Sequence, residues 1–128
     1  LTPGMRRAQK AMADFLPLID WPRFRRRNLA GEVRAKGQHV FACGSGDQAL
    51  VWLLRRGGTG ADGRMRGDLP PAPACLQLPL AAGAARVVEW NTQDGVRVRE
   101  QVVETEQGML RYETSPIAGD LALAIRAL

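Results

Sequence analysis

Short apolar runs separated by turn residues are the feature that most constrains how this chain can fold. From about residue 32 onward, runs of five to nine residues either alternate between apolar and polar side chains or are apolar throughout, and turn-forming residues stand between them. Such spacing is typical of strands rather than helices. The expected strands are 32–36, 39–43, 49–56, 75–80, 85–91, 96–104, 109–114 and 121–128.

The last of these runs shows the alternation most clearly, because Leu121, Leu123 and Ile125 share one face of the predicted strand. Tight turns are expected at 92–95 (TQDG) and 106–108 (EQG). Since no helical segment separates the runs, the sequence predicts a mainly β fold, an antiparallel β-sandwich of about eight strands with one N-terminal helix. The residues expected to supply much of its core are Val51, Trp52, Leu53, Val87, Trp90, Leu121, Leu123 and Ile125.

The N-terminal helix is predicted over residues 2–16, with Thr2 as its cap and Pro3 at its first position. A closed sandwich buries its own core, so the apolar stripe of this helix needs another partner. The helix is expected to fold back on the outer face of a sheet, to dock against a second copy as a homodimer, or to remain loosely held. The stripe consists of Met5, Ala8, Met12, Phe15 and Ile19.

Length and charge limit the classes of function. A chain of 128 residues fits one compact domain, and no apolar run approaches the roughly 20 residues of a membrane span, so no membrane partner is expected. The net charge of +5 comes from scattered arginines, dense only at 23–27 and without interleaved exposed aromatics, which argues against a nucleic-acid partner. The start lacks the apolar core of a signal peptide and begins on Leu, which suggests a piece of a longer chain, cytoplasmic or secreted.

The stretch FACGSGDQALVWLLRRGG, residues 41–58, could be taken for a phosphate cradle or a nucleophile site. No helix is predicted after its glycines, so a two-residue turn at Ser45 and Gly46 between two strands explains it better. On one strand, His39 and Cys43 would lie about 13 Å apart, too far for a catalytic dyad. We therefore expect Cys43 to be a small buried residue, His39 to be partly exposed, and Ser45 to lack a base.

Metal and acid–base sites are equally weakly indicated. The spacing of Cys43 and Cys75 around a single histidine matches no zinc motif, and Asp62 and Asp68 lack the alternating ligands of a calcium loop. No cofactor or metal is therefore expected, and a disulfide is left open. Carboxylates that could in principle form a hydrolytic pair are predicted instead to lie on solvated strand faces: Glu89, Glu100, Glu104, Glu106 and Glu113.

Residues 57–74 are rich in glycine and proline and have no apolar period, so a long, mobile insertion between two strands is expected. The insertion contains the tripeptide Arg66-Gly67-Asp68, which is known from cell-adhesion loops. Three residues recur easily by chance, and we interpret the tripeptide as a coincidence.

Four segments together resemble a known family: FLPLIDWPRFRRRN, HVFACGSGDQALVWLLRRGG, LQLPLAAGAARVVEWNTQDG and PIAGDLALAIRAL. The chain resembles the C-terminal β-sandwich domain of bacterial glycoside hydrolases, a family often labelled as collagen-binding. It departs from the family pattern in the four residues after Trp90 and in the 57–74 insertion. The residues that carry the resemblance are Phe15, Asp20, Trp21, Ala49 to Leu53, Gly57, Gly58, Trp90, Asn91, Gly95, Pro116, Gly119 and Asp120.

The resemblance implies an accessory module without catalytic residues of its own, which packs against and stabilises the (β/α)8 barrel of a glycoside hydrolase. Residues 1–24 would then be the helix and linker at the end of that barrel, and residues 25–128 the accessory domain. A carbohydrate-binding module is the first alternative and needs exposed aromatic rings, and a small protein-interaction domain is the second. The aromatic candidates include Trp21, Phe24, Trp52, Trp90 and Tyr112.

Overall fold

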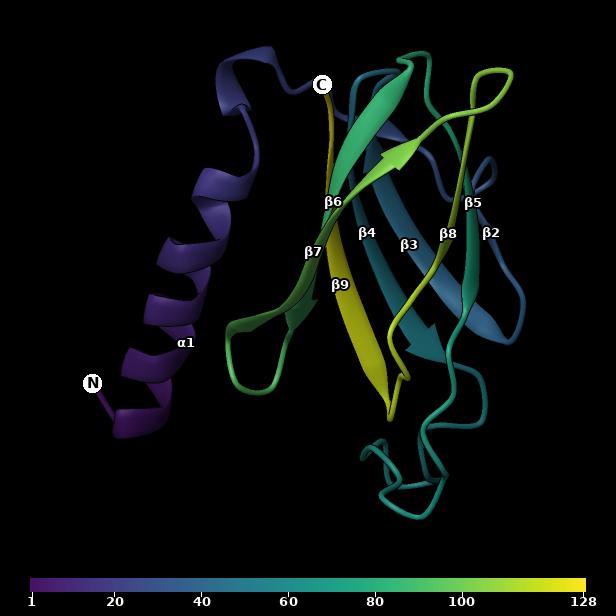
Figure 1. The fold of residues 1–128 in the computed structure, drawn as a ribbon. Coiled ribbons are helices and arrows are strands. Elements are labelled where there is room, and N and C mark those ends of the chain that lie inside the picture. The colour runs from purple at the N-terminus through teal and green to yellow at the C-terminus, as the bar shows by residue number, and fades with distance from the viewer.

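The computed structural model describes residues 1–128 and has nine strands in two antiparallel sheets (Figure 1). The larger sheet has the order β1-β3-β4-β9-β6-β7, and the smaller sheet has the order β2-β5-β8. This arrangement confirms the predicted β-sandwich with one N-terminal helix. The strands are β1 (Arg27–Asn28), β2 (Arg34–Ala35), β3 (Gln38–Gly44), β4 (Gln48–Arg55), β5 (Cys75–Pro79), β6 (Ala84–Asn91), β7 (Val96–Glu104), β8 (Met109–Glu113) and β9 (Asp120–Ala127).

All eight predicted strands are present, although the run at 32–36 is reduced to the two residues of β2. The sequence did not indicate β1, because Arg27 and Asn28 have no apolar pattern. That strand exists only through its partner, since Asn28 pairs with Cys43 at the edge of β3.

The predicted hairpin turns are confirmed at 92–95 and 106–108, where Gly95 and Gly108 adopt φ values of 67° and 73°. The turn between β3 and β4 differs by one position from the prediction, because the Ser45 amide donates to the Gln48 carbonyl and Gly46 lies in the middle. The glycine that needs positive φ is Gly44, at 149°, and a Cβ there would lie 2.1 Å from the Gln48 carbonyl oxygen.

The main core lies between the two sheets and is built from inward-facing residues of both. Leu53 and Leu123 of the larger sheet and Leu76, Leu78 and Leu110 of the smaller one are fully buried there. Six of the eight predicted core residues belong to this cluster: Val51, Leu53, Val87, Leu121, Leu123 and Ile125.

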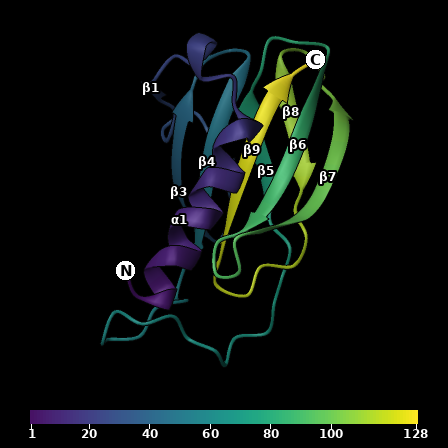
Figure 2. The same ribbon diagram turned by 90° about the vertical axis from the view of Figure 1, so that its left-hand side faces the viewer.

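The helix α1 (Pro3–Phe15) begins as predicted, with the Thr2 side chain accepting a hydrogen bond from the Met5 amide at 3.2 Å. It lies across the outer face of the larger sheet (Figure 2) and is followed by the short helices η1 (Leu16–Leu18) and η2 (Trp21–Arg23). No helix of the structure is both long and apolar enough to cross a membrane.

Only the end of α1 and the residues after it are held tightly against the sheet. Leu18 and Ile19 are buried in a second cluster with Val88, Trp90 and Ala124, and Phe15 packs against its margin. Of the arrangements considered for the helix, the structure therefore shows folding back on the sheet. The first turns remain open, because Met5 and Met12 are 52% and 58% exposed.

The segment between β4 and β5 contains no strand, in agreement with the predicted insertion, and it hangs below both sheets in Figure 1. It is tied to the body at its second half. Ala72 and Ile117 exchange two backbone hydrogen bonds of 3.2 and 2.8 Å, and the Arg55 guanidinium donates to the Pro70 carbonyl.

Candidate functional site

Two aromatic rings stand on the outer face of the larger sheet. Phe41 of β3 lies directly opposite Trp52 of β4, and the two side chains are 52% and 39% exposed. The prediction that Trp52 belongs to the core is therefore wrong. Side chains alternate along a strand, so with Val51 and Leu53 facing the smaller sheet, Trp52 has to face outward.

The two rings support each other and are fixed by a polar contact. Their centroids are 5.0 Å apart with an interplanar angle of 30°, so the two rings are tilted against each other and form no flat platform. The Trp52 indole N–H donates to Asp120 Oδ2 at 2.8 Å, and the Thr92 hydroxyl donates to the same oxygen at 2.6 Å. One carboxylate thus sets the orientation of the indole.

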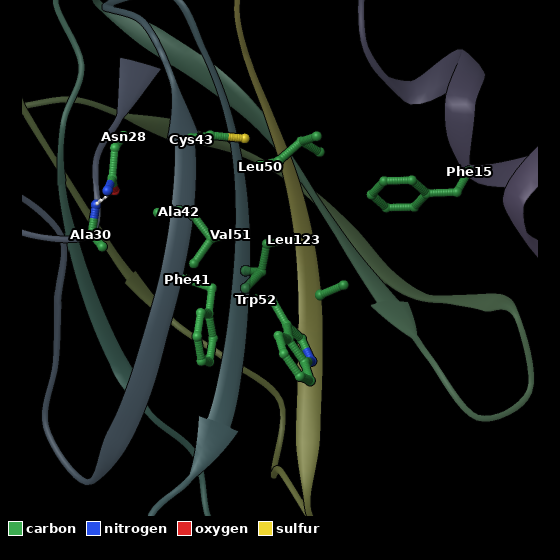
Figure 3. Close-up of a pocket in the computed structure, with 11 residues that line it drawn as sticks. Phe15, Asn28, Ala30, Phe41, Ala42, Cys43, Leu50, Val51, Trp52 and Leu123 are labelled. Atoms are coloured by element: carbon green, nitrogen blue, oxygen red, sulfur yellow. Dashed lines mark hydrogen bonds between the residues drawn. The ribbon is translucent and has the colours of Figure 1, made fainter. Parts of the chain in front are cut away.

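A hollow that we term the apolar groove runs beside this pair, with a volume of about 500 Å³ (Figure 3). Asn28 is its one polar side chain, and the Asn28 Oδ1 already accepts a hydrogen bond from the Ala30 amide. A second hollow of about 280 Å³, the helix groove, lies between α1 and the sheet and is lined by Met12. Because Phe15 and Ala122 line both, the two grooves form one apolar surface.

The remaining aromatic candidates are mostly covered. Trp90 is 6% exposed, but it lies under α1 with its ring edge-on to Phe15 at 5.4 Å, so it is buried outside the core between the sheets. Trp21 is 36% exposed and packs on Phe24 at 5.2 Å. Tyr112 is buried between the sheets.

A buried carboxylate is the most unusual polar feature of the chain. Glu89 of β6 is fully buried, which corrects its predicted place on a solvated face. Its oxygens accept hydrogen bonds from the Ser115 amide at 2.7 Å and the Ser115 hydroxyl at 2.6 Å, and Arg99 lies 3.3 Å away. Glu100, Glu104, Glu106 and Glu113 are exposed, as predicted.

Arg99 extends this cluster to the smaller sheet. Its guanidinium donates to the Tyr112 hydroxyl at 3.2 Å and to the Glu113 carbonyl at 2.6 Å. Burial raises the pKa of the Tyr112 phenol above its ordinary value, against the opposing hydrogen bond from Arg99. The Glu89 carboxylate is closed off from solvent and joins β6 and β7 to Ser115, which follows β8, so we infer that it helps to hold the two sheets together.

The cysteine, serine and histidine candidates do not come together in one site. His39 and Cys43 are both on β3, as expected, and Cys43 is half-buried rather than fully buried because it faces the apolar groove. Both Cys43 and Cys75 are free thiols. The Ser45 hydroxyl donates to the Asp47 carboxylate in the turn, and no group of three or more potential metal ligands is assembled.

The two charged side chains of the tripeptide at 66–68 form an ion pair with each other. The Arg66 guanidinium donates to both carboxylate oxygens of Asp68, at 3.0 and 2.6 Å, and this contact lowers the pKa of Asp68. The two charged ends that an adhesion receptor would read are thus paired with each other, which supports the interpretation as a coincidence.

Sequence reasoning missed Phe41 as an exposed residue and Glu89 as a buried one, although signals for both existed. A hairpin that turns at 45–48 places Phe41 opposite Trp52, and alternation with Val87 places Glu89 on the inner face. The alternation with Val87 was overlooked for Glu89, because a charged residue is not expected on a face that otherwise carries apolar side chains.

Neither the protein-family models nor the curated proteins that we compared with the chain gave a match. The candidate surfaces therefore stand on their own chemistry. The apolar groove and helix groove are suited to packing against another apolar surface, and the exposed ring of Phe41 is suited to contact with a ligand.

Proposed function

We propose that this chain is a non-catalytic accessory β-sandwich domain of a bacterial glycoside hydrolase, which packs against the hydrolase's (β/α)8 barrel. The observation that carries the proposal is the continuous apolar surface of the apolar groove and the helix groove. It joins the aromatic pair to the open face of α1. The resemblance of the sequence to such accessory domains supplies the identity of the partner.

The physical argument concerns what remains uncovered after the sandwich has closed. No residue of α1 is buried, while the core between the sheets is complete without the helix. The apolar side of the helix and the adjoining sheet face are therefore available for a partner. Covering apolar surface contributes about 25 cal/mol for each Å² removed from water, so a barrel docked here would stabilise both domains.

The test compares the barrel that the proposal places upstream, kept through residue 24, with and without residues 25–128. The expected result is a barrel whose melting temperature is higher when the domain is attached. Met5→Gln with Met12→Gln should remove much of this gain, because both side chains are exposed and neither holds the sandwich together. Arg6→Gln with Lys10→Gln, on the other side of α1, is the matched control and should keep it.

Two results would contradict the proposal. A preceding segment that is not a glycoside-hydrolase barrel would refute the identity of the partner. A barrel whose stability and activity are the same with and without the domain would refute the docking, and a separate protein bound at the same surface would favour a protein-interaction domain instead.

A carbohydrate-binding module is the second candidate function, favoured by the exposed rings of Phe41 and Trp52. Because the two rings are tilted by 30°, they leave no broad flat platform, so this geometry does not support binding to a crystalline polysaccharide surface. A soluble chain that lies against the side of one ring is a better match.

A further inference from the structure

A third hollow, which we term the basic groove, adjoins the apolar groove, since Ala30 and Phe41 line both. It has a volume of about 640 Å³ and lies where β2, the start of β3 and the residue after β4 meet. Apolar side chains, among them Val33 and Val40, form part of its wall. The rest of its lining is polar and consists of the neutral Gln38 and four basic residues: Arg34, Lys36, His39 and Arg56.

The three permanent cations of this groove have no acidic partner. Arg34, Lys36 and Arg56 are exposed, and none of them takes part in the nine salt bridges of the structure. Nine of the other fifteen lysine and arginine side chains do pair with a carboxylate. Like charges gathered without counter-charge repel one another, and an anion in the groove would relieve that repulsion.

The groove also offers one aromatic surface. Phe41 lines both the basic groove and the apolar groove, and Trp52 stacks on it. The close-up of the apolar groove shows the Phe41 ring beside the Trp52 ring (Figure 3), and the Phe41 side chain is exposed. A ligand in the basic groove therefore meets an apolar ring edge or face and several cations at the same time.

We propose that the basic groove binds a segment of an acidic polysaccharide, one that carries carboxylate or sulfate groups on its sugar rings. Guanidinium groups pair with both kinds of anion through two parallel hydrogen bonds, and the apolar side of a pyranose ring packs on an aromatic side chain. A single-stranded nucleic acid is the less suitable polyanion, because it needs a row of aromatic rings for successive bases and this groove has one.

This site does not depend on the docking proposal, since no residue of α1 lines the basic groove. The test is titration calorimetry of the chain with polygalacturonate and with chondroitin sulfate, at low and at physiological salt, with neutral galactan and a single-stranded oligothymidylate as comparison ligands. The expected result is binding to at least one acidic polysaccharide that weakens with salt and is absent with galactan.

The variants separate a built site from general attraction to a basic protein. Arg34→Gln, Lys36→Gln and Arg56→Gln together should weaken binding by about tenfold or more, the equivalent of one lost charge-assisted contact. The matched control removes three charges elsewhere, with Arg7→Gln, Arg25→Gln and Arg26→Gln. None of these three forms a salt bridge, and the control should change the affinity less than about threefold.

Phe41→Ala tests the aromatic contact, and because the ring is exposed the variant should keep its melting temperature. Weaker binding by this variant is expected. The proposal is overturned by equal losses in the groove and control variants, by equal affinity for galactan, by tighter binding of the oligothymidylate, or by no binding of either acidic polysaccharide.

Discussion

Truncation of the buried carboxylate, Glu89→Ala, is expected to be the most destabilising change of a charged residue in this chain. Two hydrogen bonds from Ser115, at 2.7 and 2.6 Å, end on Glu89. Bonds to a charged group each contribute about 1.5–3 kcal/mol, which sets an upper range of roughly 3–6 kcal/mol. Arg99 adds little, because its side chain is 34% exposed and can turn to water.

Water entering the space left by the truncation restores part of this loss, so we expect a decrease of about 3–4 kcal/mol in the free energy of unfolding. For a domain of this size that corresponds to a melting temperature lower by roughly 10–15 °C. Glu89→Gln keeps the volume and one acceptor oxygen, and should lose about half as much. The measurement is urea denaturation followed by tryptophan fluorescence, together with a thermal melt.

Glu100→Ala is the matched control, because Glu100 is exposed on the neighbouring strand and pairs with Arg86 and Arg97. Ion pairs exposed to this degree contribute about 0–1 kcal/mol, so the control should melt near the wild-type temperature. If Glu89→Ala behaves like Glu100→Ala, the inference that Glu89 joins the two sheets is wrong.

Three further predictions follow from the packing and the titration of single residues. Trp90→Ala should lower the free energy of unfolding by about 3 kcal/mol or more in chemical denaturation, because the ring is 6% exposed beneath Phe15, and an unchanged midpoint would mean that the helix does not cover it. Replacing residues 59–68 by a short Gly/Asn turn should lower the free energy of unfolding by less than about 1 kcal/mol. Ala72→Pro should lower it more, because it removes the amide that donates to the Ile117 carbonyl, and the reverse order in thermal melts would refute this division of the insertion. Tyr112 is the only tyrosine, so ultraviolet titration reports on it alone and should find a phenol pKa above the ordinary value of about 10. Because the phenol of the unfolded chain then ionises at lower pH than that of the folded chain, the free energy of unfolding should fall as the pH rises through this range, and Tyr112→Phe should abolish this contribution.

Local pattern was sufficient for α1 and for every strand except β1. Alternation along each run predicted the strands from β3 to β9, and the glycines at 95 and 108 marked turns that need positive φ. Thr2 and Pro3 likewise marked the start of α1. These features depend on residues close to one another in the chain, so a sequence can specify them without knowledge of the partner elements.

The tertiary structure decided which face of each strand is buried. Alternation says that Trp52 and Val51 point in opposite directions, but only the position of the smaller sheet decides which of them is covered. For the same reason Trp90 became buried on the outer face, where the end of α1 lies over it. The predicted core list failed at Trp52, because it grouped this residue with its strand neighbours Val51 and Leu53, whose side chains point to the opposite face; Trp90 is buried as predicted, but in the second cluster.

The candidate site shows the same division between local and long-range causes. Glu89 is stable inside the sandwich only because Ser115, far along the chain, brings two donors to it. The basic groove likewise gathers Arg34 and Lys36 with Arg56, which lies beyond the next hairpin, and Phe41 between them. The sequence determined the strands, turns and helix start of this protein, whereas the assembly of distant segments determined which side chains are buried, which are exposed and which meet, because burial depends on what packs against each face.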